Sequence, residues 1–361
     1  MSSTEPERPA AAAPASEWSD APTRTGWGIW LHAIRPPAEL ADLAAAAEAL
    51  GAAAVLIADE GTDRDLFVCL AAMAQRTRRI QLFGAVTNPH SRHPVAVAAA
   101  FASLGELAPG RIVAGFGTGG SRVFGPMGLA PPRPYTSLVE CLDVVQALWR
   151  GETVHHEGEF SVRGARLDWI PPPMPLALAG RGPRVERLAA ERADWVLLAG
   201  RAVHTVPELI GRLRRNARAV RRRPPAIAWN PVAAWTEPMR ATLRAHLAYM
   251  AVDMPAADRS HLGLDDARTR ELSQVVNSDG PEAAAALIPE SVVDRYAIVG
   301  DRSEVVARLG ALCQIVRPEL LVFDLAEYSS AFVETLASLA MDAGAVADHN
   351  QEAPHGLDSH H

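Results

Sequence analysis

Lysine is absent from this chain of 361 residues, so all 35 of its basic residues are arginines. The 42 acidic residues exceed them and give a formal net charge of −7. Because phosphate backbones are bound by concentrated positive charge, this balance without a basic face argues against a nucleic-acid partner. Long uncharged apolar runs are also missing, and none reaches the roughly 18 residues that a membrane-spanning helix needs. We therefore expect no membrane partner either.

Cysteine is scarce and scattered along the chain. The three thiols, Cys69, Cys141 and Cys313, are odd in number, far apart and without a CxxC pair. Cysteines with this distribution typically pack as small buried hydrophobic side chains in a protein of a reducing compartment. The histidines have no spacing that demands a metal. We predict a cytoplasmic protein without a metal site.

The two ends of the chain have little that would pack. Residues 1–24 are rich in Ala, Pro, Ser and Glu and contain no basic segment leading into an apolar run. We expect a disordered tail there rather than a signal peptide, and a second flexible tail at 346–361. The remaining 25–345 is long enough to form one large domain.

Glycines are concentrated in RIVAGFGTGG at 111–120, where an apolar strand runs into residues with almost no side chain. A backbone this bare leaves room for a flat or anionic ligand. Three of these glycines match the G-x-G-x-x-G dinucleotide pattern, which also requires a first strand, an immediate helix and a later acidic residue. The stretch lies a third of the way along the chain, and Gly125-Pro126 predicts that no helix starts directly after it. We therefore set a nicotinamide-binding Rossmann fold aside.

Short apolar runs alternate with amphipathic helical patterns along most of the chain. Strands that are apolar on both faces and separated by helices indicate a parallel sheet covered on both sides. About eight strands and eight helices over roughly 310 residues predict an α/β fold of the (β/α)8 TIM-barrel type, with an open doubly wound sheet as the alternative. The strands are expected at 27–33, 53–59, 79–86, from 111 onward, and at 175–179, 194–199, 226–232 and 319–325.

Two insertions interrupt this pattern. After the fourth strand, 152–162 resembles an exposed hairpin. After the seventh strand, a helix at 238–251 is followed by an irregular segment at 254–290, which topology places where it would cover a pocket and select a substrate. In such a barrel the chemistry belongs to the loops at the C-terminal ends of the strands, and these loops are rich in glycine and polar residues.

Five motifs in this chain resemble one enzyme superfamily. They are AVTNPHSRHP, SLGELAPGRIVAGFGTG, ALWRGETVHHEGEF, LAGRGPRVERLAAERADWVLL and YAIVGDRSEVVARL, in that order over 26–335. They resemble the bacterial luciferase-like flavin and deazaflavin oxidoreductases. The similarity is greatest to the branch that uses coenzyme F420, which includes methylenetetrahydromethanopterin reductase and the deazaflavin-dependent glucose-6-phosphate dehydrogenase.

The resemblance implies a deazaflavin ring at the barrel mouth. The ring would rest on a bulge with a non-prolyl cis peptide between Ala85 and Val86, where small residues let a planar ring lie against the backbone. A glycine-rich turn before a helix would hold a phosphate, with Arg181 or Arg184 adding a charge-assisted bond; a surface role is the alternative for Arg181. The other implied cofactor contacts are Asp59, Thr87, Asn88, Gly117, Thr118, Gly119, Gly180 and Gly182.

Two departures from the family bear on catalysis. Many relatives end the second strand with Asp-His or Glu-His, where this chain has Asp59 and Glu60. The sugar-phosphate dehydrogenase has a catalytic Glu directly after its Gly-Thr-Gly, where this chain has Gly120. We therefore do not expect oxidation of glucose 6-phosphate.

Glu60 is the leading candidate for a proton donor. A carboxyl beside an apolar ring has its pKa raised towards working pH, which suits proton transfer. An ion pair with Arg64 or another arginine is the alternative role for Glu60. His32 after the first strand is the second catalytic candidate, together with His90 and His93 after the third.

The sequence thus predicts an oxidoreductase that transfers hydride between coenzyme F420 and an activated C=C or C=N bond of a small organic substrate. The cofactor carries the chemistry and the protein positions it. One alternative is a luciferase-like monooxygenase that uses FMNH2 and O2; another is a barrel that binds a ligand without catalysis. The resemblance also suggests a homodimer and a separate reductase that supplies the reduced cofactor.

Overall fold

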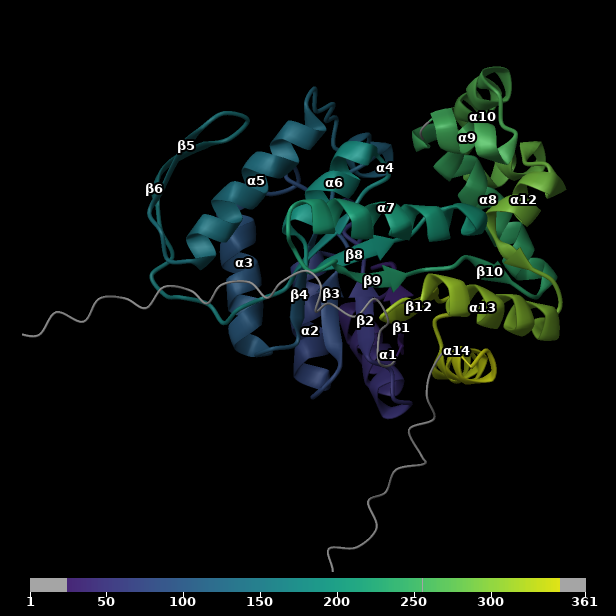
Figure 1. Cartoon of the computed structure of the whole chain (residues 1–361), viewed down its shortest axis with the longest axis horizontal. Helices are drawn as coiled ribbons and strands as arrows, with labels where there is room; N and C mark the ends of the chain where they lie inside the picture. Colours follow the sequence, from purple (N-terminus) through teal and green to yellow (C-terminus); the bar gives the residue numbers. More distant parts are fainter. Residues whose placement is uncertain (1–24, 255, 345–361) are drawn as a thin grey trace, which may run out of the picture.

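A closed barrel of parallel strands forms the centre of the protein (Figure 1). The computed structural model describes residues 25–254 and 256–344, so the predicted tails at 1–24 and 346–361 lie outside the described residues. The barrel strands are β1 (Gly26–Leu31), β2 (Ala54–Ile57), β3 (Gln81–Gly84), β4 (Ile112–Phe116), β7 (Leu176–Ala179), β8 (Trp195–Leu198), β9 (Ala226–Trp229) and β12 (Leu320–Asp324). Their order is β1-β12-β9-β8-β7-β4-β3-β2, and β1 pairs with both β2 and β12. This confirms the predicted (β/α)8 barrel and excludes an open sheet.

A helix follows each barrel strand and packs on its outer face. The α13 helix begins with the predicted capping box, in which the Glu304 amide donates to Asp301 and the Asp301 amide donates to Glu304, both at 2.9 Å. The helices of the outer ring are α1 (Pro37–Ala49), α2 (Leu66–Arg76), α3 (Pro94–Leu107), α5 (Pro134–Trp149), α6 (Pro183–Arg192), α7 (Val206–Ala219, preceded by the short η2 at Val203–Thr205), α13 (Arg302–Val316) and α14 (Ser330–Asp342).

The inside of the barrel is a packed core rather than a channel. Leu56, Phe83, Val113, Leu197 and Val322 form a buried cluster together with small residues of the neighbouring strands. Side chains on a strand alternate between its two faces, so these positions mark the inward face. Two positions further along the same face, β2, β3, β8 and β12 reach the mouth of the barrel at Ala58, Ala85, Ala199 and Asp324.

The chain between β4 and β7 departs from one prediction. The predicted hairpin is present as β5 (Val154–Glu157) and β6 (Ser161–Ala165), which pair in antiparallel fashion. The prediction that no helix starts after the glycines was wrong, because α4 (Ser121–Phe124) begins there with its Val123 and Phe124 amides bonded to the Gly120 carbonyl. A single turn ends before Pro126 is reached, so the missing proline donor does not prevent it.

The insertion after β9 is helical, and the prediction of an irregular segment at 254–290 was wrong. It is bracketed by β10 (Ala233–Ala234) and β11 (Ile298–Val299), which pair with each other, and its helices have a buried cluster of their own. Of these helices, the sequence predicted the first, at 238–251; the others have too few apolar residues for a clear period in the sequence. In Figure 1 they group beyond β10, to the upper right of the barrel. They are α8 (Glu237–Asp253), α9 (Ala256–Leu262), α10 (Asp266–Asp279), α11 (Pro281–Ala284), η3 (Ala285–Leu287) and α12 (Glu290–Tyr296).

Candidate active site

A cavity of about 560 Å³ opens at the C-terminal mouth of the barrel. The ends of all eight barrel strands contribute to its lining, together with α8 from the insertion. This is where a barrel of this type places its chemistry, and the volume is that of a small-molecule site. Thr87, His90, His93 and Arg184 are not among the lining residues. The other predicted catalytic and cofactor-binding residues line the cavity: His32, Asp59, Glu60, Ala85, Val86, Asn88, Gly117, Thr118, Gly119, Gly180, Arg181 and Gly182.

Main chain from β3 and β4 forms a flat shelf at one side of the cavity. The peptide bond between Ala85 and Val86 is cis, as predicted. A side chain on Gly115 would come within 1.8 Å of the Gly84 carbonyl oxygen, and one on Gly117 within 2.8 Å of a Val86 methyl. The two strand ends therefore approach closely only because these positions have no side chain. The shelf suits a planar ring.

Thr87 lies behind the shelf rather than in the cavity. It is fully buried, and its hydroxyl donates a 2.6 Å hydrogen bond to the Asp59 carboxylate. Burial raises the pKa of Asp59, whereas the hydrogen bond from Thr87 opposes that rise. Thr87 thus orients a carboxyl that itself faces the cavity.

The loop from Gly180 to Gly182 follows β7, which pairs with β4, so it lines the cavity beside the shelf. The Nη1 of Arg181 is buried and has no hydrogen-bond partner among the described residues. A Cβ on Gly182 would meet no atom within 4 Å, so the loop leaves open space directly before α6. Arg184 instead stacks its guanidinium on the Tyr135 ring at 3.8 Å, away from the lining. Of the two candidate arginines, Arg181 is the one placed to bind an anion.

A buried ion network holds this loop from behind. Arg201, at the end of β8, donates to the Gly180 carbonyl at 3.0 Å and to Glu186 at 3.2 Å. It also pairs at 3.3 Å with Asp258 on α9, while Arg212 pairs at 3.3 Å with the other oxygen of Glu186. Arg201 is 9% exposed, and burial lowers the pKa of its guanidinium. The network links the loop to the insertion. The sequence analysis did not predict this link.

His32 stands at the end of β1, with its backbone fixed by Tyr328. The His32 amide donates to the Tyr328 hydroxyl at 2.9 Å, and that hydroxyl donates to the His32 carbonyl at 3.2 Å. Burial raises the pKa of Tyr328 to about 12. The Nδ1 of His32 is buried and unpartnered among the described residues, so the ring has a polar atom that a ligand can satisfy.

The other loop histidines have structural surroundings. His93 caps α3 by accepting from the Val95 amide at 3.3 Å. His90 packs edge-on against Phe124 at 5.5 Å between ring centroids, and burial lowers its pKa. Neither is among the residues that line the cavity. The Asn88 side chain accepts from the amides of His90 and Ser91 at 2.9 Å, so its oxygen is used within the loop.

Several lining residues escaped the sequence analysis. Trp30, Asn230 and Asp324 lie on the inward face of β1, β9 and β12 or directly after it. An alternation of inward and outward side chains along each strand would have identified them. Because the strands are apolar on both faces, the sequence does not show that alternation. His246, Tyr249 and Met250 come from α8, which was not expected at the mouth.

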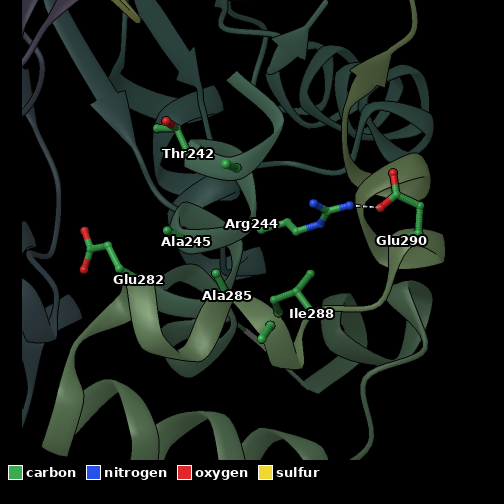
Figure 2. A pocket seen from close by; sticks show the side chains of 9 residues that line it. Thr242, Arg244, Ala245, Glu282, Ala285, Ile288 and Glu290 are labelled. Carbon is green, nitrogen blue, oxygen red and sulfur yellow. Dashed lines mark hydrogen bonds and ion pairs between the residues drawn. The ribbon is translucent and has the colours of Figure 1, made fainter. Parts of the chain in front are cut away.

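A second cavity, of about 650 Å³, lies within the insertion between α8, η3 and α12. Figure 2 shows its lining, in which Arg244 from α8 reaches across to pair with Glu290. Arg240 pairs with the same carboxylate at 3.8 Å. None of the predicted site residues lies there. We place the active site at the barrel mouth.

The fold and this cavity define the class: a (β/α)8 enzyme with a ligand site at the C-terminal ends of its strands. The chain belongs to the luciferase-like monooxygenase family, whose model matches residues 20–316. It is 25% identical to a 5,10-methylenetetrahydromethanopterin reductase of Methanolobus tindarius over 80% of this chain and 91% of the relative. It is 38% identical to an F420-dependent glucose-6-phosphate dehydrogenase of Nakamurella multipartita, over 46% of this chain and 53% of that relative. These relatives are oxidoreductases.

Solved structures share the fold at low sequence identity. The coenzyme F420-dependent tetrahydromethanopterin reductase of Methanopyrus kandleri superposes with a TM-score of 0.73 at 20% identity, over 87% of this chain and 98% of that chain. An F420-dependent secondary alcohol dehydrogenase, solved with an F420-acetone adduct, reaches 0.69 at 19% identity, over 89% and 99%. No helix in the described part of the chain is long and apolar enough to cross a membrane.

Proposed function

We propose that this protein is an oxidoreductase that transfers hydride between coenzyme F420 and an activated C=C or C=N bond of a small organic substrate. The observation that carries the proposal is the pairing of a main-chain shelf with an unpartnered arginine in one cavity. The shelf at Ala85 and Val86 accepts a planar ring. Arg181 and the open space at Gly182, after the neighbouring strand β7, accept an anionic group beside the shelf.

The residues present fit the deazaflavin cofactor of the relatives. Its ring would lie on Ala85, Val86 and Gly117, and its phosphate would bind Arg181 and the amides at the start of α6. When bound in its reduced form, coenzyme F420 supplies a hydride. Asp59, Glu60 and His32 lie on the wall next to β1, where a proton can be exchanged with a substrate.

The relatives support deazaflavin over FMN. Three of the four proteins compared above carry F420 in their printed names: the glucose-6-phosphate dehydrogenase of Nakamurella multipartita, the reductase of Methanopyrus kandleri and the secondary alcohol dehydrogenase. The fold is also shared by an EDTA monooxygenase, with a TM-score of 0.64 at 18% identity. The fold alone therefore does not choose between the two cofactors.

Titration of the purified protein with each cofactor tests the proposal. We expect F420 to bind with micromolar or lower Kd by fluorescence, and FMN to bind at least tenfold more weakly. Arg181→Gln should weaken F420 binding about tenfold, as expected for loss of one charge-assisted contact. Arg184→Gln is the matched control, since Arg184 is engaged with Tyr135. Tight FMN binding without F420 binding would favour the monooxygenase instead.

Turnover separates the enzyme from a binding protein. The proposed activity predicts that reduced F420 is oxidised when an activated C=C or C=N substrate is added. Tight cofactor binding without turnover on any such acceptor would favour the non-catalytic barrel. A homodimer, a separate reductase and a cytoplasmic location remain predictions, and sedimentation velocity tests the first of them.

A further inference from the structure

One fully buried hydroxyl next to the active site lacks a hydrogen-bond partner. Tyr296, the last residue of α12, is completely shielded from solvent, and its hydroxyl bonds to no residue within 25–254 and 256–344. A phenylalanine would fill the same space without leaving a polar atom unsatisfied. Because buried polar groups are almost always paired, this hydroxyl indicates a state of the protein in which it has a partner.

The Tyr296 hydroxyl lies against the end of β8, at the wall of the active-site cavity. A Cβ built on Gly200, which lines that cavity, would lie 3.6 Å from the tyrosine oxygen and 2.6 Å from the methyl group of Met250. Gly200 also has a φ of 64°, in the left-handed region that favours glycine. The missing side chain therefore lets Tyr296 and Met250 pack directly against the strand end.

The neighbouring loop carries a second unpartnered group. The strands β7 and β8 pair side by side, so the loops that follow them are adjacent. Arg201, directly after Gly200, donates to the Gly180 carbonyl at 3.0 Å and so joins the two loops. The next residue after Gly180 is Arg181, whose buried Nη1 has no partner in the described part of the chain. Two unsatisfied polar groups thus lie on adjacent segments of one wall.

The two groups complement each other in hydrogen-bonding capacity. A guanidinium only donates, whereas a tyrosine oxygen accepts as well as donates. Burial raises the pKa of Tyr296, so the hydroxyl keeps its proton, and among the charged groups that act on it Arg181 has the largest effect. Arg201 acts on the hydroxyl too, but its guanidinium is already paired with Glu186 and Asp258. Arg181 is the donor that still has a bond to give.

Building on the proposed function, we propose that Tyr296 is a positioning residue for Arg181. The guanidinium binds an anionic group through one edge and donates from Nη1 to the Tyr296 oxygen. That second bond holds the guanidinium in the orientation that faces the anion. Charge-assisted hydrogen bonds add orientation as well as affinity. The anion that the proposed function supplies is the phosphate of coenzyme F420, and Tyr296 acts on it only through Arg181.

Fluorescence titration with two deazaflavins tests this role. The first is coenzyme F420, and the second is its deazaflavin ring with the ribityl chain but without the phosphate. We expect Tyr296→Phe to weaken F420 binding about fivefold and to leave binding of the phosphate-free compound unchanged. In the Arg181→Gln background, the same change should weaken F420 no further, since the two residues act as one unit. Tyr135→Phe, which removes a tyrosine hydroxyl outside the lining, should alter neither affinity.

Urea unfolding of the ligand-free protein is the second arm of the test. Because the hydroxyl has no partner in this structure, Tyr296→Phe should leave the midpoint unchanged or raise it. A lower midpoint with unchanged F420 affinity would overturn the inference and assign the hydroxyl to the fold.

Three binding results would also overturn the inference. They are equal F420 affinity of Tyr296→Phe and wild type, equal weakening of both deazaflavins, and a further loss in the Arg181→Gln background. In each of these cases, F420 binding by the wild type would leave the proposed function standing. Failure of the wild type to bind F420 would overturn both.

Discussion

The Asp59 carboxyl is held by the fold in a state that favours its proton. Burial raises its pKa above the ordinary value of 3.8, and Thr87 opposes the rise. The native protein therefore binds this proton more tightly than the unfolded chain does. Stability from this group is fully present at low pH and is lost as pH rises through the raised pKa.

Asp59→Asn tests that sign directly. The amide keeps an acceptor for Thr87 but carries no charge, so the variant should gain stability relative to wild type as pH rises from about 4 to 7. The gain should be about 1.4 kcal/mol for each unit by which the pKa is raised. Urea unfolding of both proteins at several pH values measures it. A difference in the free energy of unfolding that does not change with pH would show that Asp59 titrates as it does in the unfolded chain.

Two glycines at the cavity make a contrasting pair. A methyl group on Gly115 would lie 1.8 Å from the Gly84 carbonyl oxygen, so Gly115→Ala must push β3 and β4 apart. We expect a loss of about 3 kcal/mol in the free energy of unfolding. Gly182→Ala meets open space and should cost less than about 1 kcal/mol. Its effect should instead appear as weaker F420 binding, because the methyl group occupies the space before α6.

At the scale of elements, Arg201 joins three parts of the chain that are distant in sequence. It binds the loop after β7, α6 through Glu186, and α9 of the insertion through Asp258. Removing one partner from a buried pair leaves an uncompensated charge behind. This network therefore fixes the loop from Gly180 to Gly182 relative to the insertion.

Arg201→Met should reveal this role. We expect it to lower the free energy of unfolding by about 3 kcal/mol and to weaken F420 binding, since Gly180 loses its donor. Arg212→Met is the matched control, because that side chain is 40% exposed and its other partner, Glu208, is 79% exposed; its cost should stay below about 1 kcal/mol. Equal costs for the two variants would argue against a special role for Arg201.

The sequence predicted best those elements that local pattern determines. The barrel strands and outer helices follow from alternating apolar runs and caps such as Asp301, and the glycine loops follow from missing side chains. The contact between Arg201 and Asp258 depends on how the insertion folds back, which no local period encodes. The position of α8 over the cavity was missed for the same reason. Met250 reaches the mouth because Gly200 leaves it room.

At the scale of the whole molecule, three hydrophobic clusters divide the packing: one inside the barrel, one between the strands and the outer helices, and one in the insertion. The barrel strands and outer helices share one large buried network, while the insertion helices pack around a cluster of their own that includes Leu247, Leu272 and Tyr296. The pairing of β10 with β11 and the ion pair between Arg201 and Asp258 join the insertion to the barrel. We propose that both belong to the single domain predicted at 25–345, with the insertion as its less stable part.

Hydrogen exchange measured by mass spectrometry tests that division. Leu272 and Leu321 are both fully buried, the first on α10 and the second on β12. Truncation of a buried leucine to alanine costs about 2–5 kcal/mol. Leu272→Ala should therefore speed exchange in residues 237–296 while the barrel strands keep their protection, because the smaller cluster opens without the larger one. Leu321→Ala should instead speed exchange throughout the barrel and in the insertion that depends on it. If Leu272→Ala speeds exchange in the barrel strands equally, the insertion and the barrel unfold as one unit. In that case α8, which lines the cavity, is as stable as the strands that line it.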